Sequence, residues 1–273
     1  EPMPVGALAV EAMGSTRDVS CLPIVVGALA RRELLTVACR VLVRFGEDAA
    51  PYCAGALSDT STPQRVRMEL ASVMAEMGPA AVDRLRDQLV AEPRGSVAYR
   101  VLLALERHGA GAGTGRQRDA QVVALVERYL SDAERYRRFR AVLLRPSDHP
   151  GQQTRAHGVL VRIVREKQLH AIQRATRVYG ASTHREDFAS ISAGLGSPDA
   201  GRVASSLELL DGTVGPRFRG IVRAARSYAD GDDAVPASLD YAAVLGEMQR
   251  DDSRTLVELA KEQRRLIELQ AAP

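Results

Sequence analysis

Hydrophobic positions in the first 109 residues recur with the spacing of an α-helix. Three stretches carry apolar side chains three and four residues apart, which places them on one helical face. Each stretch runs up to a glycine, and a glycine after a helix permits the left-handed C-cap, so the pattern predicts helix ends there. The apolar positions are Ala38, Leu42 and Phe45, then Leu70, Met74 and Met77, then Val101 or Leu102 with Leu105. The glycines are Gly14, Gly46, Gly78 and Gly109, at intervals of 32, 32 and 31 residues.

A second, shorter apolar segment lies between consecutive glycines, at 21–29, 51–57 and 82–89. Each unit is therefore expected to fold as helix, turn and helix within about 31–32 residues. Neither helix could bury its apolar face alone, whereas stacking against neighbouring units would cover both. The segment 4–13 resembles the second helix of a preceding unit, so we expect the sequence to begin inside an array.

Longer helical patterns follow, and they predict a different organisation for the rest of the chain. The glycine-rich run 109–115 comes after a helix and not after a strand, which favours a connector over a phosphate cradle. We expect two domains, a repeat array over 1–109 and a continuing helical region over 116–273. Acidic, turn-rich residues predict a loop at 230–240. The predicted helices are 117–144, 152–179 (ending at Gly180), the pair 184–196 and 201–214, and a capping helix at 253–270.

Composition favours helices and excludes several other classes of protein. The chain of 273 residues is 45% hydrophobic but only 4% aromatic, with no Trp, so its core must use Ala, Leu and Val. No apolar run approaches the ~18 residues of a membrane span. Three cysteines without a CxxC pair (Cys21, Cys39 and Cys53) predict buried thiols in a reducing compartment. A net charge of +3 is too small to indicate nucleic-acid binding by itself.

Two short stretches resemble a known family. The segment 57–71, LSDTSTPQRVRMELA, is similar to a HEAT repeat, in which an Asp after the first helix and an Arg in the second form a ladder. Asp59 and Arg67 hold these places, although Leu35 and Ala98 replace the arginine in the neighbouring units. The segment 202–211 resembles a stretch, roughly RxxALELLDNLL, of bacterial HEAT arrays attached to nucleotide-transporter-like membrane proteins, but it departs at 212–214. The matching residues are Arg202, Ala204, Leu207, Glu208, Leu209, Leu210 and Asp211.

The resemblance implies an all-α fold, a right-handed α-solenoid of HEAT-like helix pairs with longer helices in its second half. It further implies a soluble, cytoplasmic domain of a bacterial protein similar to ADP/ATP translocases, tethered to the inner membrane through its parent chain. The domain itself would not insert into the membrane. Its partners would be another protein or other domains of its own parent chain, and its work would be that of a non-catalytic interaction or regulatory scaffold.

The residue types needed for catalysis or metal binding do not form a recognisable pattern. There is no HExxH or zinc-type spacing and no GxSxG. Asp230, Asp232 and Asp233 lack the remaining ligands of an EF-hand. We therefore expect no enzyme activity, no cofactor and no metal. The five histidines are scattered along the chain, which favours structural or surface roles over metal binding; they are His108, His149, His157, His170 and His184.

Arginines supply the candidate binding residues. Arg219, Arg223 and Arg226 are spaced i, i+4 and i+7, which places them on one face of a helix. The alternative function is therefore an α-solenoid that binds nucleic acid or a phosphate ligand through an arginine-rich face. Scarce aromatics disfavour nucleic acid, and a chain with only two lysines also suggests arginine supplied by coding bias. On the face of the second helices of the repeats, the candidates are Arg40, Arg44, Arg67, Arg100 and Arg107.

Overall fold

The computed structural model describes residues 5–91, 95–107, 116–145, 152, 154–183, 187–231 and 240–271. Every regular element in these ranges is a helix, and none of them contains a strand, which confirms the all-α prediction. The chain divides into two compact units, which we call the N-terminal unit (Glu1–Gln121) and the C-terminal unit (Val122–Pro273).

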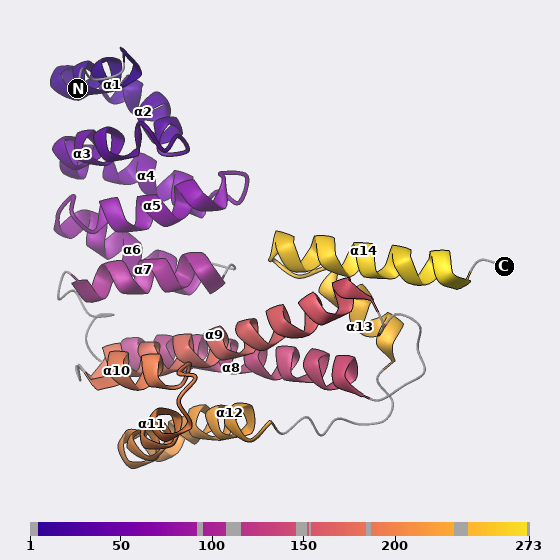
Figure 1. Cartoon of the computed structure of the whole chain (residues 1–273). Coiled ribbons are helices and arrows are strands. Elements are labelled where there is room, and N and C mark those ends of the chain that lie inside the picture. Colours follow the sequence, from indigo (N-terminus) through magenta and orange to yellow (C-terminus); the bar gives the residue numbers. More distant parts are fainter. Residues whose placement is uncertain are drawn as a thin grey trace. The chain divides into compact units, whose positions relative to one another are not determined.

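Helix pairs repeat along the N-terminal unit. Helices α1, α3, α5 and α7 contact one another in that order and form one row (Figure 1). Helices α2, α4 and α6 each pack on the helix that follows, and α4 also contacts α6. The predicted helix–turn–helix units are therefore present. The helices are α1 (Val5–Thr16), α2 (Leu22–Ala28), α3 (Leu35–Phe45), α4 (Ala50–Ser58), α5 (Gln64–Met74), α6 (Pro79–Ala91) and α7 (Gly95–Arg107).

Glycines serve two different purposes in the N-terminal unit. Gly46 follows the end of α3, as predicted, with φ +60° and ψ −136°, which is not the left-handed cap conformation that was expected. Gly78 was predicted to cap the preceding helix, but α5 ends at Met74 and Gly78 directly precedes α6 with φ +125°. Both glycines have a positive φ, which favours glycine. Gly14 was predicted to end a helix, and this is wrong because it lies inside α1. A Cβ on Gly14 would approach Val41 of α3 to 2.8 Å, so the glycine instead permits close packing. Gly109 lies outside the described residues.

The C-terminal unit is built around α9 (Arg155–Thr183), which contacts α10, α12 and α14. Neighbours in sequence also pack together, α10 with α11, α11 with α12 and α13 with α14. The other helices are α8 (Arg116–Leu144), α10 (Asp187–Gly194), α11 (Ala200–Thr213), α12 (Arg219–Asp230), α13 (Tyr241–Met248) and α14 (Arg254–Ala271).

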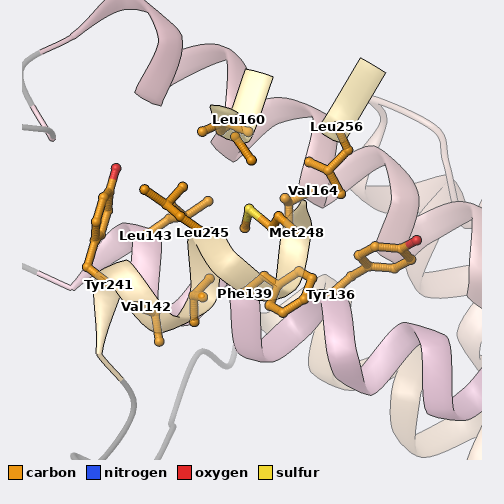
Figure 2. Close-up of a cluster of buried hydrophobic side chains, with 12 residues drawn as sticks. Tyr136, Phe139, Val142, Leu143, Leu160, Val164, Tyr241, Leu245, Met248 and Leu256 are labelled. Atoms are coloured by element: carbon orange, nitrogen blue, oxygen red, sulfur yellow. The ribbon is translucent and has the colours of Figure 1, made fainter. Parts of the chain in front are cut away.

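One hydrophobic cluster joins α8, α9, α13 and α14 (Figure 2). Phe139 lies edge-on to Tyr136, with ring centroids 6.1 Å apart. Met248, at the end of α13, is fully buried between these rings and Leu256 of α14. The sequence pattern predicted no element over 241–248, so α13 is an addition that supplies a third of this core.

The predicted end of the 152–179 helix at Gly180 is also wrong, because α9 continues to Thr183. Gly180 is buried, and a Cβ at this position would collide with Phe188 of α10. As at Gly14, the absent side chain allows two helices to approach closely.

Substitutions at two helical glycines test this interpretation. Gly180→Ala should lower the free energy of unfolding by about 1–3 kcal/mol, because the added methyl overpacks the α9–α10 contact. Gly212→Ala is the matched control, since nothing lies within 4 Å of its Cβ, and it should raise stability by up to about 1 kcal/mol through helix propensity. Urea denaturation followed by circular dichroism measures both, and equal effects would contradict the packing role of Gly180.

A second pair of variants tests the core of the N-terminal unit. Leu70 of α5 has no exposed surface, so Leu70→Asp buries a carboxylate and should cost about 3 kcal/mol or more. Arg223→Ala removes an exposed side chain from α12 and should change stability by less than about 0.5 kcal/mol. Thermal melting distinguishes them, and negligible shifts for both would show that Leu70 is misplaced in the core.

Candidate functional site

The three arginines of the predicted stripe are exposed on α12, whereas its apolar residues Ile221, Val222 and Ala225 are buried. The amphipathic pattern of α12 therefore fixes which face carries the charge. We call Arg219, Arg223 and Arg226 the α12 arginines.

A single carboxylate from the preceding helix engages two of them. Asp211 of α11 pairs with Arg226 at 2.7 Å, between Oδ2 and Nη2, and with Arg219 through Oδ1. The Arg219 guanidinium also donates to the backbone carbonyl of Asp211 at 3.1 Å. Arg223 forms no ion pair with any residue that the structure describes. A shallow cavity of about 410 Å³ adjoins this group, lined by Asp211, Arg219, Val222, Arg223, Arg226, Ser227 and Asp230.

The arginines predicted on the second helices of the repeats mostly serve the packing of the N-terminal unit. Arg44 and Arg40 of α3 reach Glu11 of α1 at 2.6 and 3.9 Å. These exposed pairs link two consecutive helices of the row but contribute little stability. Arg100 is half-buried in α7, and Arg107 is the last residue of that helix, with its side chain outside the described residues.

The prediction that Arg67 belongs to a binding surface is wrong, because its side chain is fully buried. Its Nε donates to the carbonyl of Leu57 at 2.7 Å, which ties α5 to the last turn of α4. The exposed Asp59 carboxylate accepts from the hydroxyl and the backbone N–H of Ser61, at 2.6 and 2.8 Å. These hydrogen bonds lower the pKa of Asp59, with a smaller contribution from the charge of Arg67. Both residues predicted to form the ladder thus stabilise the α4–α5 turn.

A buried ionic cluster in the C-terminal unit was not predicted. The Asp251 side chain is 1% exposed and accepts charged hydrogen bonds from Lys167 of α9 and Arg135 of α8, each at 3.2 Å. The Tyr136 hydroxyl and the backbone N–H of Ser253 donate to the same carboxylate, both at 2.9 Å. The cluster therefore fastens the turn between α13 and α14 to two other helices.

The charges around Asp251 outweigh its burial. Burial alone would raise the pKa of Asp251, but the charge of Lys167 and the hydrogen bonds from Ser253 and Tyr136, together with Arg135, lower it. Burial and the charge of Asp251 raise the pKa of Tyr136, so its hydroxyl remains a donor. Arg135 and Lys167 also lie 5.0 and 5.2 Å from the centre of the Tyr136 ring, within cation–π range. The Asp251 carboxylate thus accepts hydrogen bonds from four groups of the surrounding chain, which indicates a structural role.

The pKa values of the Cys39 and Cys53 thiols are shifted away from those of a reactive thiolate. Burial raises the pKa of Cys53 to about 12, and burial with the charges of Glu69 and Glu76 raises that of Cys39 to about 11. A thiolate nucleophile requires the opposite shift. His157 Nδ1 lies 2.9 Å from the Tyr241 hydroxyl.

The described residues contain neither a cluster of metal ligands nor a membrane-spanning helix. Over the ranges given above, no group of three or more His, Cys, Asp or Glu residues could hold a metal ion. Within those same ranges, no helix has the length and apolar character to cross a bilayer. His108, His149 and His184 lie outside the described part of the chain.

Comparison with known proteins assigns neither a family nor a function to this chain. No family model, no curated protein and no solved structure matches this chain.

The Asp251 cluster predicts a pH-dependent contribution to stability. Asp251→Asn should lower the free energy of unfolding by about 1–3 kcal/mol near neutral pH. Because the folded pKa of Asp251 lies below its unfolded value, the wild-type advantage is present above the unfolded pKa and is lost as the pH falls through the folded one.

Urea titrations at neutral pH and below about pH 4 measure this difference, with Asp252→Asn as the exposed neighbouring control. A stability difference between wild type and Asp251→Asn that stays constant over this range would contradict the charged cluster.

Proposed function

We propose that this chain is a non-catalytic protein-interaction or regulatory scaffold domain, built as a right-handed α-solenoid of HEAT-like helix pairs. The observation that carries the proposal is the repetition in the N-terminal unit. The pairs α2–α3, α4–α5 and α6–α7 follow one another, and their second helices continue the row that begins with α1. Arrays of this kind present extended surfaces to partners.

The α4–α5 pair supports the resemblance to HEAT repeats. Arg67 of α5 donates to the end of α4, and Asp59 organises the turn between the two helices. From the resemblance we also propose a bacterial, cytoplasmic setting within a larger transporter-like chain held at the inner membrane.

An apolar surface on α1 supports a partner-binding role for this helix. Ala7, Val10 and Gly14 are buried on one side of this helix. On the other side, exposed apolar residues recur at i, i+3, i+4 and i+7, and we call them the α1 stripe. Val5 is 84% exposed and Leu8 51% exposed. Helix α1 therefore has two apolar faces, and only one of them is covered. An apolar helix face that is left exposed is typical of an interaction surface. The α1 stripe consists of Val5, Leu8, Ala9 and Ala12.

The nucleic-acid alternative receives less support. Its strongest feature was the α12 arginines, and Asp211 already engages two of the three. A phosphate backbone would have to compete with that carboxylate for Arg219 and Arg226.

Site-specific photo-crosslinking in the native host tests the scaffold function. A photoreactive amino acid at Leu8 or Ala12 should give one defined adduct, either with another protein or with a distant segment of the same chain. Asp87, exposed on α6, is the control position and should not give that adduct.

A second variant makes the result specific. Leu8→Glu should abolish the adduct formed from Ala12 while leaving the melting temperature unchanged, because Leu8 is exposed. Absence of adducts from the α1 stripe, or the same adducts from Asp87, would refute the proposed interaction surface.

A further inference from the structure

A second cavity, of about 390 Å³, lies in the C-terminal unit between α8, α9 and α12. This volume lies within the range of small-molecule pockets. Gly220 brings α12 close to α8 here, since a Cβ on it would approach Leu130 to 2.9 Å. The lining residues are Leu130, Ala133, Glu134, Arg137, Gln168, Gly220, Arg223, Ala224 and Ser227.

Gln168 of α9 supplies a hydrogen-bond donor to this cavity. The residue is only 2% exposed, and its Oε1 accepts from Arg140 Nη1 at 3.4 Å. Because the guanidinium can only donate, it fixes the amide with oxygen toward Arg140 and the NH₂ group away from it. No described residue accepts from this NH₂ group. The Nε2 atom is not among the fully buried polar atoms without a partner in the described residues, so it reaches the cavity surface, where a water or a ligand can accept its hydrogen bond.

The charges of the lining leave an excess of one cation. Glu134 accepts two hydrogen bonds from Arg137, both at 2.8 Å, so these two side chains neutralise each other. Arg223 is left without a carboxylate partner among the described residues and borders the cavity on α12. Ser227, one turn further along α12, adds a hydroxyl. The cavity thus combines a guanidinium, an amide and a hydroxyl, which all donate hydrogen bonds.

We infer that this cavity binds a small phosphomonoester. Its phosphate would accept hydrogen bonds from Arg223 and Gln168, since guanidinium groups pair with phosphate oxygens in a planar, bidentate geometry. Its body would lie on the apolar side of the cavity, formed by Leu130, Ala133 and Ala224. This site goes beyond the scaffold function, because it would let a metabolite act on the same domain.

Isothermal titration with phenyl phosphate tests the inference, with inorganic phosphate, benzoate and duplex DNA as comparison ligands. Phenyl phosphate should bind to the whole chain more tightly than inorganic phosphate or benzoate. Arg223→Gln should weaken it about tenfold or more, the range expected for a charge-assisted hydrogen bond. Arg217→Gln removes an equal charge from a nearby exposed position outside the cavity and should leave the affinity unchanged.

Gln168→Glu provides a second variant, because it keeps an acceptor for Arg140 but replaces the donor by an anionic oxygen. It should abolish phenyl phosphate binding while circular dichroism shows a folded chain. Failure of wild type to bind phenyl phosphate, or equal losses in Arg217→Gln and Arg223→Gln, would overturn the inference. So would binding of duplex DNA without binding of phenyl phosphate, which would assign Arg223 to a nucleic-acid surface. None of these outcomes affects crosslinking from the α1 stripe, so the two proposals fail independently.

Discussion

Close approach of helices with small side chains is the constraint on which this structure depends. A core without Trp, and with few other aromatics, gains dispersion energy only if the helices lie near one another. The glycines at helix contacts make this approach achievable, Gly14 against Val41 and Gly180 against Phe188. Where aromatics do occur they are grouped, as in the contacts of Tyr179 with Phe188 and Phe218, at 5.2 and 4.9 Å between ring centroids.

The arginine content has a structural explanation in several places. Arg67 is buried to hold a helix end, and Arg135 is part of the cluster around Asp251. At the surface, Arg44 pairs with Glu11, and Arg226 with Asp211. The high arginine content is thus partly accounted for by intramolecular pairs. Among the α12 arginines, Arg223 forms no such pair with the described residues, and it borders the cavity between α8, α9 and α12.

The periodic pattern predicted the helices well because the spacing of apolar residues directly reports which face is covered. The positions named from that pattern, such as Leu42, Leu70 and Leu105, are all buried. The role of a glycine could not be predicted in this way, since both a helix end and a close contact between helices favour a residue without a side chain. Helix α13 was not predicted, because its eight residues give too short a pattern of apolar positions beside an acidic segment.

The candidate sites were less predictable, because their members are distant in sequence. The spacing of the α12 arginines was correctly interpreted as one exposed face, but nothing in it predicted that Asp211 would engage two of them. The partners of Asp251 lie 84 and 116 residues away from it. Only packing brings such groups together, so an aspartate beside Asp252 in a polar segment gave no signal. Arg67 was predicted to lie on a surface because it is charged. It is buried, and its guanidinium donates to the carbonyl of Leu57, a partner that only the packing of α5 on α4 reveals.

The position of α12 connects the cavity to the rest of the C-terminal unit. This helix lines the cavity together with α8, and it packs on α9, where Tyr228 lies 5.6 Å from the guanidinium of Arg165. Helix α9 also contacts α10 and α14, so it touches most of the elements of the unit. A ligand that contacts both α8 and α12 stabilises the arrangement in which both line the cavity, relative to any arrangement in which they separate. By linkage, a partner that binds that same arrangement more tightly must also strengthen binding of the ligand, which is the thermodynamic requirement for a scaffold to respond to a metabolite.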